Sequence, residues 1–237
     1  MSLDEVVDDV SAALRHVQES YPTSPPPILI AHSLGGAHVQ YFLSRKAKAF
    51  GGKAPEGSVG GLVLLASASL SGGSRITTNW HASMPSAGLF PWSERPLPDT
   101  PEKVRGVFFQ DTTPEETVET WLRECRTAEE SIRTAIGMLR PVGDAGDVLS
   151  ALEGVSTQDG PERKVLCVAA DGDCLIPPDM VVENADAYVG ALGNDDAGGV
   201  VMRTVIPDSG HHVMMDVSWE TCARRIINWI EGRDVIS

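Results

Sequence analysis

Hydrophobic residues recur along this chain in two patterns, one typical of amphipathic helices and the other of buried strands. Apolar positions at helical spacing, separated by polar and acidic ones, occupy residues 3–18, and the same spacing returns at 36–48. Compact apolar runs lie at 28–30 and 62–66. Each run is too short for a helix and stands next to proline or glycine, so we predict a buried strand at each of them.

The second half of the chain continues this alternation. Strands are predicted at 165–169 and 200–206, and helices at 181–192 and 219–231. A strand followed by a helix, several times in succession, indicates parallel strands whose connecting helices pack on the sheet. The predicted fold class is therefore α/β, with a mostly parallel sheet that carries helices on both faces.

Residues 67–140 interrupt the alternation. Prolines and aromatic residues become frequent there, and helical spacing is found around 114–125 and 129–139. We interpret this segment as a helical cap inserted between a first core region, 1–66, and a second, 141–237. Its aromatic residues either line an apolar substrate pocket or pack the cap onto the core. They are Trp80, Phe90, Trp92, Phe108, Phe109 and Trp121.

Charge and composition restrict the classes of partner. The 237 residues include 19 Lys plus Arg against 33 Asp plus Glu, a formal charge of −14, and no basic run interrupts the acidic background. We therefore expect neither nucleic acid nor an anionic membrane as a partner. No stretch approaches the roughly 18 apolar residues of a membrane span, and the N-terminal residues are acidic instead of forming a basic and apolar leader. A cytoplasmic protein with a small-molecule substrate is expected.

The cysteines and histidines indicate no metal or redox chemistry. The 4 cysteines are scattered without the spacing of a zinc ligand set or of a dithiol motif, and the 6 histidines form no ligand set. We expect reduced cysteines and no cofactor.

A candidate nucleophile lies between the first predicted strand and the helix that follows it. The segment 31–36 reads AHSLGG. On such a tight strand-to-helix turn the hydroxyl of Ser33 would stand exposed, as a nucleophile of acyl transfer must. We expect Gly35 to avoid a side-chain collision at the turn and Gly36 to let the helix pack close to the sheet. The amide of Leu34, at the helix N-terminus, is the candidate donor to an oxyanion.

A serine nucleophile needs a base, and the base needs a carboxylate that orients it. Asp171 and Asp173 both follow the strand predicted at 165–169, at the edge of the sheet where Ser33 is expected. We assign the acid to Asp173. Asp171 is the alternative, with Asp173 as a turn former, and both carboxylates could instead cap backbone amides of the loop.

The candidate base follows the strand predicted at 200–206. His211 and His212 lie in the loop after it, and Gly210 permits a turn that aims His211 back at the serine. We therefore choose His211, with His212 as the alternative. The chain order serine, aspartate, histidine matches one of the three familiar orders of such a triad.

Three motifs together resemble those of the α/β-hydrolase fold. They are AHSLGG at 31–36, AADGDCLIPP at 169–178 and PDSGHH at 207–212, and they occur in the order found in that family. Essentially the whole chain is similar to the later two thirds of such a protein. The resemblance implies that residues 67–140 form the lid over the substrate.

The same resemblance implies that Ser33, Asp173 and His211 form a catalytic triad. Because the residue at the tip of the strand-to-helix turn is a serine, Ser33, the chain does not resemble the haloalkane dehalogenases or epoxide hydrolases of this family, which use aspartate there. Cleavage of an ester or a related acyl bond in a small, largely apolar substrate is the expected activity. Two alternatives stay open: a truncated or decayed member without catalysis, and a cofactor-free lyase or peroxidase-like member.

The resemblance also implies a departure at the beginning of the chain. In the family, a helix leads to the strand that ends at the nucleophile turn. Several strands precede this helix, together with a loop that donates a second N–H to the oxyanion. Here residues 3–18 look like that helix, so we expect those strands and half of the oxyanion hole to be missing. The strand at 28–30 would then be an exposed apolar edge, and we expect poor solubility or weak activity.

Overall fold

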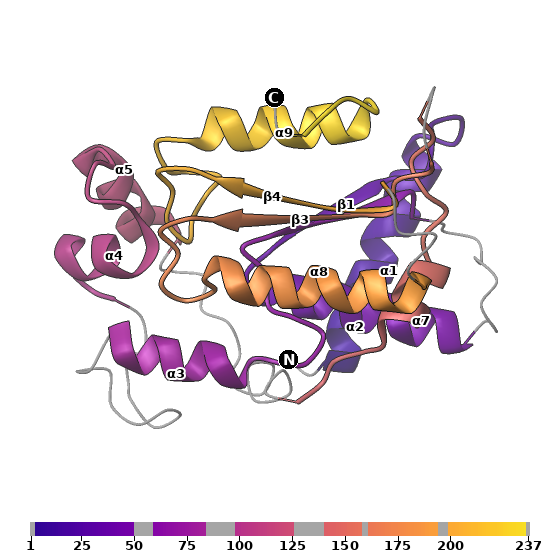
Figure 1. Ribbon diagram of the computed structural model, residues 1–237, viewed down its shortest axis with the longest axis horizontal. Coiled ribbons are helices and arrows are strands. Elements are labelled where there is room, and N and C mark those ends of the chain that lie inside the picture. The colour runs from indigo at the N-terminus through magenta and orange to yellow at the C-terminus, as the bar shows by residue number, and fades with distance from the viewer. Residues whose placement is uncertain are drawn as a thin grey trace.

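The computed structural model describes residues 3–49, 59–83, 98–125, 140–157, 161–193 and 199–235. Helices and strands alternate along most of them (Figure 1). In chain order the elements are α1 (Leu3–Ser20), β1 (Ile28–His32), α2 (Leu34–Ala49), β2 (Gly61–Leu65), α3 (Ser74–Ser83), α4 (Pro101–Phe108), α5 (Glu115–Thr120), the π-helical turn η1 (Trp121–Cys125), α7 (Ala145–Ser150), β3 (Val165–Ala170), α8 (Pro178–Leu192), β4 (Val201–Ile206) and α9 (Trp219–Ile230).

The strands form one parallel, 4-stranded sheet in the order β1-β2-β3-β4. The register pairs Ile28 with Gly61 at the start of β1 and β2, and Val165 with Val201 at the start of β3 and β4. Helix α2 connects β1 to β2, and α8 connects β3 to β4. Because parallel strands all point the same way, the loops that follow them gather at one edge of the sheet.

Helices cover both faces of this sheet (Figure 1), which confirms the predicted fold class. On one face, Trp229 of α9 joins a core cluster with Val63 of β2. On the other face, Leu64 of β2 clusters with Phe42 of α2 and with residues of α1, α7 and α8. Successive residues of β2 and β3 therefore enter two different cores, and every residue of both strands is buried. This explains why these strands are continuously apolar.

Helices of the cap segment, residues 67–140, lie at the carboxyl ends of the strands. In Figure 1, α4 and α5 lie beyond the arrowheads of β3 and β4. The helix predicted around 114–125 is present as α5 and η1. The pattern did not predict α3 and α4, since elements of 10 and 8 residues contain too few turns to show a clear helical period. The helix predicted at 129–139, Phe90 and Trp92 lie outside the described residues, and the division into core and cap stays a prediction.

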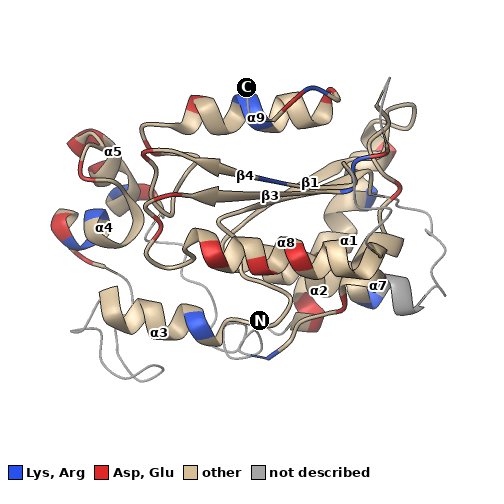
Figure 2. Ribbon diagram, viewed as in Figure 1, with Lys and Arg blue, Asp and Glu red and all other residues tan. Residues whose placement is uncertain are grey.

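Acidic side chains prevail on the surface. Figure 2 marks acidic residues along α8 and on α4 and α5, with fewer basic residues between them, in agreement with the formal charge of −14. In the part of the chain that the structure describes, no helix is both long enough and apolar enough to cross a membrane. The same residues contain no group of three or more His, Cys, Asp or Glu side chains placed to hold a metal ion.

Strand β1 forms one edge of the described sheet, because it pairs with β2 alone. Its Ile30 side chain is 53% exposed. An exposed apolar side chain on an edge strand invites pairing with the edge of another molecule. On the opposite edge, β4 also exposes Val205, but the exposed Arg203 places a charge beside it.

We expect Ile30→Lys to reduce aggregation while the fold is kept. A lysine on an edge strand discourages strand pairing between molecules, and its aliphatic stem can stay on the surface that isoleucine now covers. Light scattering during heating, at matched protein concentrations, measures the effect. Val205→Lys on the charged edge is the matched control and should change scattering less. Equal scattering of Ile30→Lys and the parent protein would show that the β1 edge does not drive association.

Candidate active site

Ser33 occupies the turn between β1 and α2 in the left-handed backbone region, with φ of 54°. This conformation is uncommon for a residue with a side chain and stores strain in the turn. Hydrogen bonds hold the turn on two sides. The Ser33 N–H donates to the carbonyl of Leu65 in β2, and the Ser33 carbonyl accepts from the amides of Gly36 and Ala68, each at 3.1 Å.

In this turn, lack of space for a side chain requires glycine at Gly36. A Cβ atom at Gly36 would lie 1.6 Å from the Oγ of Ser67, whereas one at Gly35 would have no neighbour within 4 Å. The close packing expected at Gly36 is therefore present, whereas Gly35 meets no other element of the fold, and its role within the turn stays a prediction. Leu34 begins α2, so its N–H is one of the terminal amides that find no acceptor within the helix.

His211 joins Ser33 to Asp173. Its Nε2 lies 2.8 Å from Ser33 Oγ, and its Nδ1 lies 2.8 Å from Asp173 Oδ2. The three residues come from the loops that follow β1, β3 and β4, at the same edge of the sheet. His211 is 2% exposed and Asp173 is 3% exposed. The structure thus brings together the three side chains that the sequence selected, and their chemical roles are taken up below as a proposal.

Asp173 fixes which nitrogen of His211 carries a proton. Its Oδ1 accepts from the amides of Leu175 and Ile176, at 2.8 and 2.9 Å. Burial alone would raise the pKa of the Asp173 carboxyl, but attraction to His211 and the hydrogen bonds from His211 and the two amides outweigh burial and lower that pKa. An ionised carboxylate only accepts, so Nδ1 of His211 donates to it and Nε2 is left to accept the Ser33 hydroxyl.

The two alternative residues make other contacts. The Oδ1 of Asp171 accepts from the amide of Ser209 at 3.2 Å, as a turn-forming carboxylate does. The Nε2 of His212 accepts from the indole N–H of Trp121 at 3.2 Å. In this arrangement neither Asp171 nor His212 is hydrogen-bonded to Ser33 or to the His211 ring.

His32 packs beside the nucleophile turn as an uncharged ring. Its Nε2 lies 2.9 Å from the backbone carbonyl of His211, which requires that nitrogen to donate. Burial and then repulsion by His211 lower the pKa of His32 to about 3. Burial, followed by His32 and His211, holds the pKa of His212 well below its ordinary value. Neutral imidazoles on both sides therefore leave His211 without a neighbouring positive charge.

Aromatic residues of the cap segment pack against these histidines. Phe108, Phe109 and Trp121 are buried. The Phe108 ring lies 5.9 Å from the ring of His211 and 4.8 Å from that of His212, and the Phe109 ring lies 5.6 Å from His212. The packing role considered for these residues is therefore realised around the histidines.

Asp216 is a buried polar residue near the site that sequence reasoning missed. It is 1% exposed, and its Oδ2 accepts from the amide of Gly210, the residue before His211, at 2.8 Å. The available signal was its position as a lone acid inside the apolar run at 213–217, VMMDV. An acid in such a run is expected to be satisfied by hydrogen bonds.

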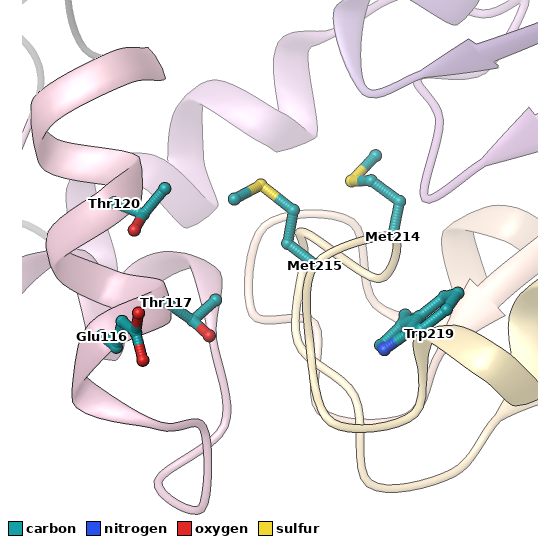
Figure 3. Close-up of a pocket in the computed structure, with 6 residues that line it drawn as sticks. All are labelled: Glu116, Thr117, Thr120, Met214, Met215 and Trp219. Atoms are coloured by element: carbon teal, nitrogen blue, oxygen red, sulfur yellow. The ribbon is translucent and has the colours of Figure 1, made fainter.

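A surface hollow of about 490 Å³ lies beside the cap (Figure 3). Figure 3 shows Glu116, Thr117 and Thr120 on one side of it and Trp219 on the other, with Met214 and Met215 between them. None of Ser33, Asp173 and His211 lines this hollow. It is therefore separate from the hydrogen-bonded group of three.

Comparisons with known proteins agree with this architecture. The family model of the alpha/beta hydrolase family matches residues 1–225. No curated protein matches the chain. Among solved structures, an esterase of Thermogutta terrifontis is 17% identical with a TM-score of 0.60, over 97% of this chain and 72% of that one.

Two further solved structures are similar in fold. A monoacylglycerol lipase of Paleococcus ferrophilus is 13% identical with a TM-score of 0.57, over 97% of this chain and 75% of that one. An esterase of Exiguobacterium antarcticum is 13% identical with a TM-score of 0.58, over 97% of this chain and 74% of that one. At these identities the likeness shows the fold.

The neutral histidines make stability depend on pH. The pKa of His32 is about 3 in the folded chain against 6.5 ordinarily, so between these values the unfolded chain binds a proton that the folded chain does not. The free energy of unfolding should therefore fall as the pH falls below 6.5, by about 1.4 kcal/mol per pH unit for such a group. The lowered pKa of His212 adds in the same direction.

Urea unfolding at several pH values between neutrality and pH 5 measures this slope. We expect His32→Asn to show a shallower slope than the parent protein, because one of the buried groups no longer titrates. His16→Asn, on an exposed position of α1, is the matched control and should keep the parent slope. The same slope for His32→Asn and the parent would mean that His32 does not contribute.

Proposed function

Since the chain belongs to the alpha/beta hydrolase family, we propose that it is a serine hydrolase that cleaves an ester or a related acyl bond in a small, largely apolar substrate. Ser33 is the nucleophile, His211 the general base and acid, and Asp173 the carboxylate that orients His211. The observation that carries the proposal is the hydrogen-bonded line from Ser33 Oγ through both ring nitrogens of His211 to Asp173, with 2.8 Å at each step.

Several features support nucleophilic chemistry over a merely structural hydrogen bond. Ser33 sits at a strained backbone position, and such strain is concentrated at functional sites. A hydroxyl that donates to a neutral imidazole is activated as a nucleophile, because the imidazole can take its proton during attack. The buried carboxylate of Asp173 stabilises the imidazolium that then forms.

In the first half of the reaction, Ser33 Oγ attacks the carbonyl carbon of the substrate while His211 Nε2 takes the hydroxyl proton. The carbonyl π electrons move to oxygen, and the N–H of Leu34, at the start of α2, donates to that oxyanion. When the intermediate collapses, the bond to the leaving group breaks and His211 returns the proton to it. The products of this half are an alcohol and an acylated Ser33.

In the second half, water replaces the alcohol. His211 Nε2 takes a proton from water as its oxygen attacks the acyl carbon, and the same oxyanion donor acts again. The bond to Ser33 Oγ then breaks, Ser33 regains its proton from His211, and the carboxylic acid leaves. No cofactor takes part in these steps.

Aromatic side chains support the choice of an apolar substrate. Trp80 of α3 is half-buried and lies 6.1 Å from the ring of Phe108, which in turn packs against His211. The partly exposed ring of Trp80 therefore leaves aromatic surface next to the buried Phe108, which contacts the ring of His211. An acyl or alkyl group would gain about 25 cal/mol for each Å² of apolar surface that it buries there.

We expect a fluorophosphonate probe to attach covalently to Ser33. Such a reagent traps a hydroxyl that an adjacent imidazole activates. Intact-mass and peptide mass spectrometry measure the adduct and its position. Ser33→Ala should remove the label, and Ser67→Ala, at a buried serine beside the same turn, is the control that should keep it. Labelling that persists in Ser33→Ala contradicts the assignment.

Asp173→Asn should lower kcat for a short p-nitrophenyl ester by up to about 10⁴-fold, because His211 loses the partner that fixes its tautomer and stabilises its charge. Asp171→Asn is the matched control. Within the described part of the chain its side chain accepts from the Ser209 amide and is not hydrogen-bonded to His211, so the loss of activity should be far smaller. If the two variants rank in the opposite order, the acid is Asp171.

A further inference from the structure

A buried carboxylate ties the loop that carries His211 to the cap segment. The Oδ2 of Asp216 accepts from the amides of Gly210 and Gln110, at 2.8 and 3.0 Å. Its Oδ1 accepts from the amide of Val217 at 2.8 Å and from the hydroxyl of Thr113 by a short hydrogen bond. Only 1% of the surface of Asp216 is exposed, so these four donors replace the hydrogen bonds that water would make to an exposed carboxylate.

Three of the four donors come from two segments that are far apart in the chain, and the fourth is the amide of the next residue, Val217. Gly210 belongs to the histidine loop, residues 207–212, and directly precedes His211. Gln110 and Thr113 belong to the segment 109–114 between α4 and α5. A single carboxylate therefore bridges the cap segment and the backbone that carries the candidate base.

Close backbone contact between the same two segments leaves little room for movement. The amide of His212 donates to the carbonyl of Phe108 at 2.9 Å. A Cβ atom on Gly210 would lie 2.8 Å from both the Phe108 carbonyl oxygen and the Cα of Phe109. Any loosening of the bridge would change the distance between these backbones and, with it, the place of the His211 ring.

Arg105 holds the cap side of the bridge from the opposite direction. Its guanidinium donates to the carbonyls of Gln110 and Asp111, at 3.2 and 3.3 Å, and to that of Thr113 by a short hydrogen bond. It also pairs with Glu115 at 2.7 Å. Arg105 thus binds the carbonyl side of the segment whose amide and hydroxyl donors face Asp216, so those donors are presented in a fixed arrangement.

The charge of Asp216 has no ion-pair partner among the described residues and is balanced by hydrogen bonds alone. A buried carboxylate held in this way is sensitive to loss of even one acceptor atom. In Asp216→Asn, an NH₂ group would replace one carboxylate oxygen. That NH₂ group is a donor and cannot accept the hydrogen bonds that the oxygen accepted. The size of the side chain would hardly change.

From this geometry we infer that Asp216 is a positioning residue for the reaction: through Gly210 and the segment 109–114 it holds His211 at hydrogen-bonding distance from Ser33. The inference rests on the proposed function for its chemical meaning. Asp216 itself does not touch the reacting atoms. A displacement of about 1 Å at a catalytic group can cost about 10²-fold in rate, so loss of such a bridge is expected to appear in kcat.

The test compares Asp216→Asn with Asp208→Asn, the same substitution at an exposed aspartate of the same loop. Turnover of a short p-nitrophenyl ester gives kcat and KM, and the proton NMR signal of the His211 Nδ1–H in the resting protein reports its geometry. For Asp216→Asn we expect kcat to fall by about 10²-fold, KM to stay near the parent value, and the proton signal to shift or broaden. Asp208→Asn should match the parent in all three.

Circular dichroism and urea unfolding establish whether each variant is folded. If folded Asp216→Asn keeps both the kcat and the His211 proton signal of the parent, or loses only stability, the residue is structural and the inference is wrong. If Asp216→Asn does not fold, Thr113→Val decides, since it removes one donor at nearly constant volume and should lower kcat in the same direction. A parent protein that neither hydrolyses esters nor labels at Ser33 would overturn the proposed function, while the proton signal would still decide the positioning role.

Discussion

The hydrogen bond between His211 Nδ1 and Asp173 Oδ2 is the interaction on which the candidate site depends. A carboxylate that is almost completely buried is costly unless hydrogen bonds satisfy it, and Asp173 receives them from His211 and from two amides of its own loop. The same bond leaves Nε2 of His211 as the acceptor that faces Ser33. One hydrogen bond therefore both stabilises the buried charge of Asp173 and leaves an accepting nitrogen of His211 facing the Ser33 hydroxyl.

The candidate site also depends on the parallel sheet, because the sheet places loops from distant parts of the sequence at one edge. Ser33, Asp173 and His211 follow β1, β3 and β4, and each loop is anchored to a strand whose register is set by its neighbours. The strands β2 and β3 are buried on both faces, so the scaffold beneath the loops is closely packed. Strain at Ser33 is tolerated on such a scaffold, since hydrogen bonds to Leu65 and Ala68 hold the turn on both sides.

The cap segment supports the core loops as well as lying beside them. Phe108 packs against His211 and His212, Trp121 packs against His212, and the amide of Gln110 donates to the carboxylate of Asp216. Phe108 and Trp121 help to bury His212, and burial is the largest cause of its lowered pKa. The cap segment thus contributes to the electrostatics around His211, although none of the three hydrogen-bonded residues belongs to it.

The sequence by itself predicted the parallel sheet and the alternation of its strands and main helices, though not the short helices α3 and α4, because the hydrophobic period is a local property of the chain. Its turn motifs also marked Ser33, Asp173 and His211 as candidates, with Asp171 and His212 as alternatives. Only the tertiary structure shows that His211 and Asp173, and not His212 and Asp171, are hydrogen-bonded in a series that reaches Ser33, because the direction of a loop side chain depends on the packing around it. It also shows that the close packing predicted at Gly36 is against Ser67, a residue that follows β2. The sequence could not predict the bridge at Asp216. Its donors at Gln110 and Gly210 lie about a hundred residues apart and come together only when the cap segment packs on the histidine loop.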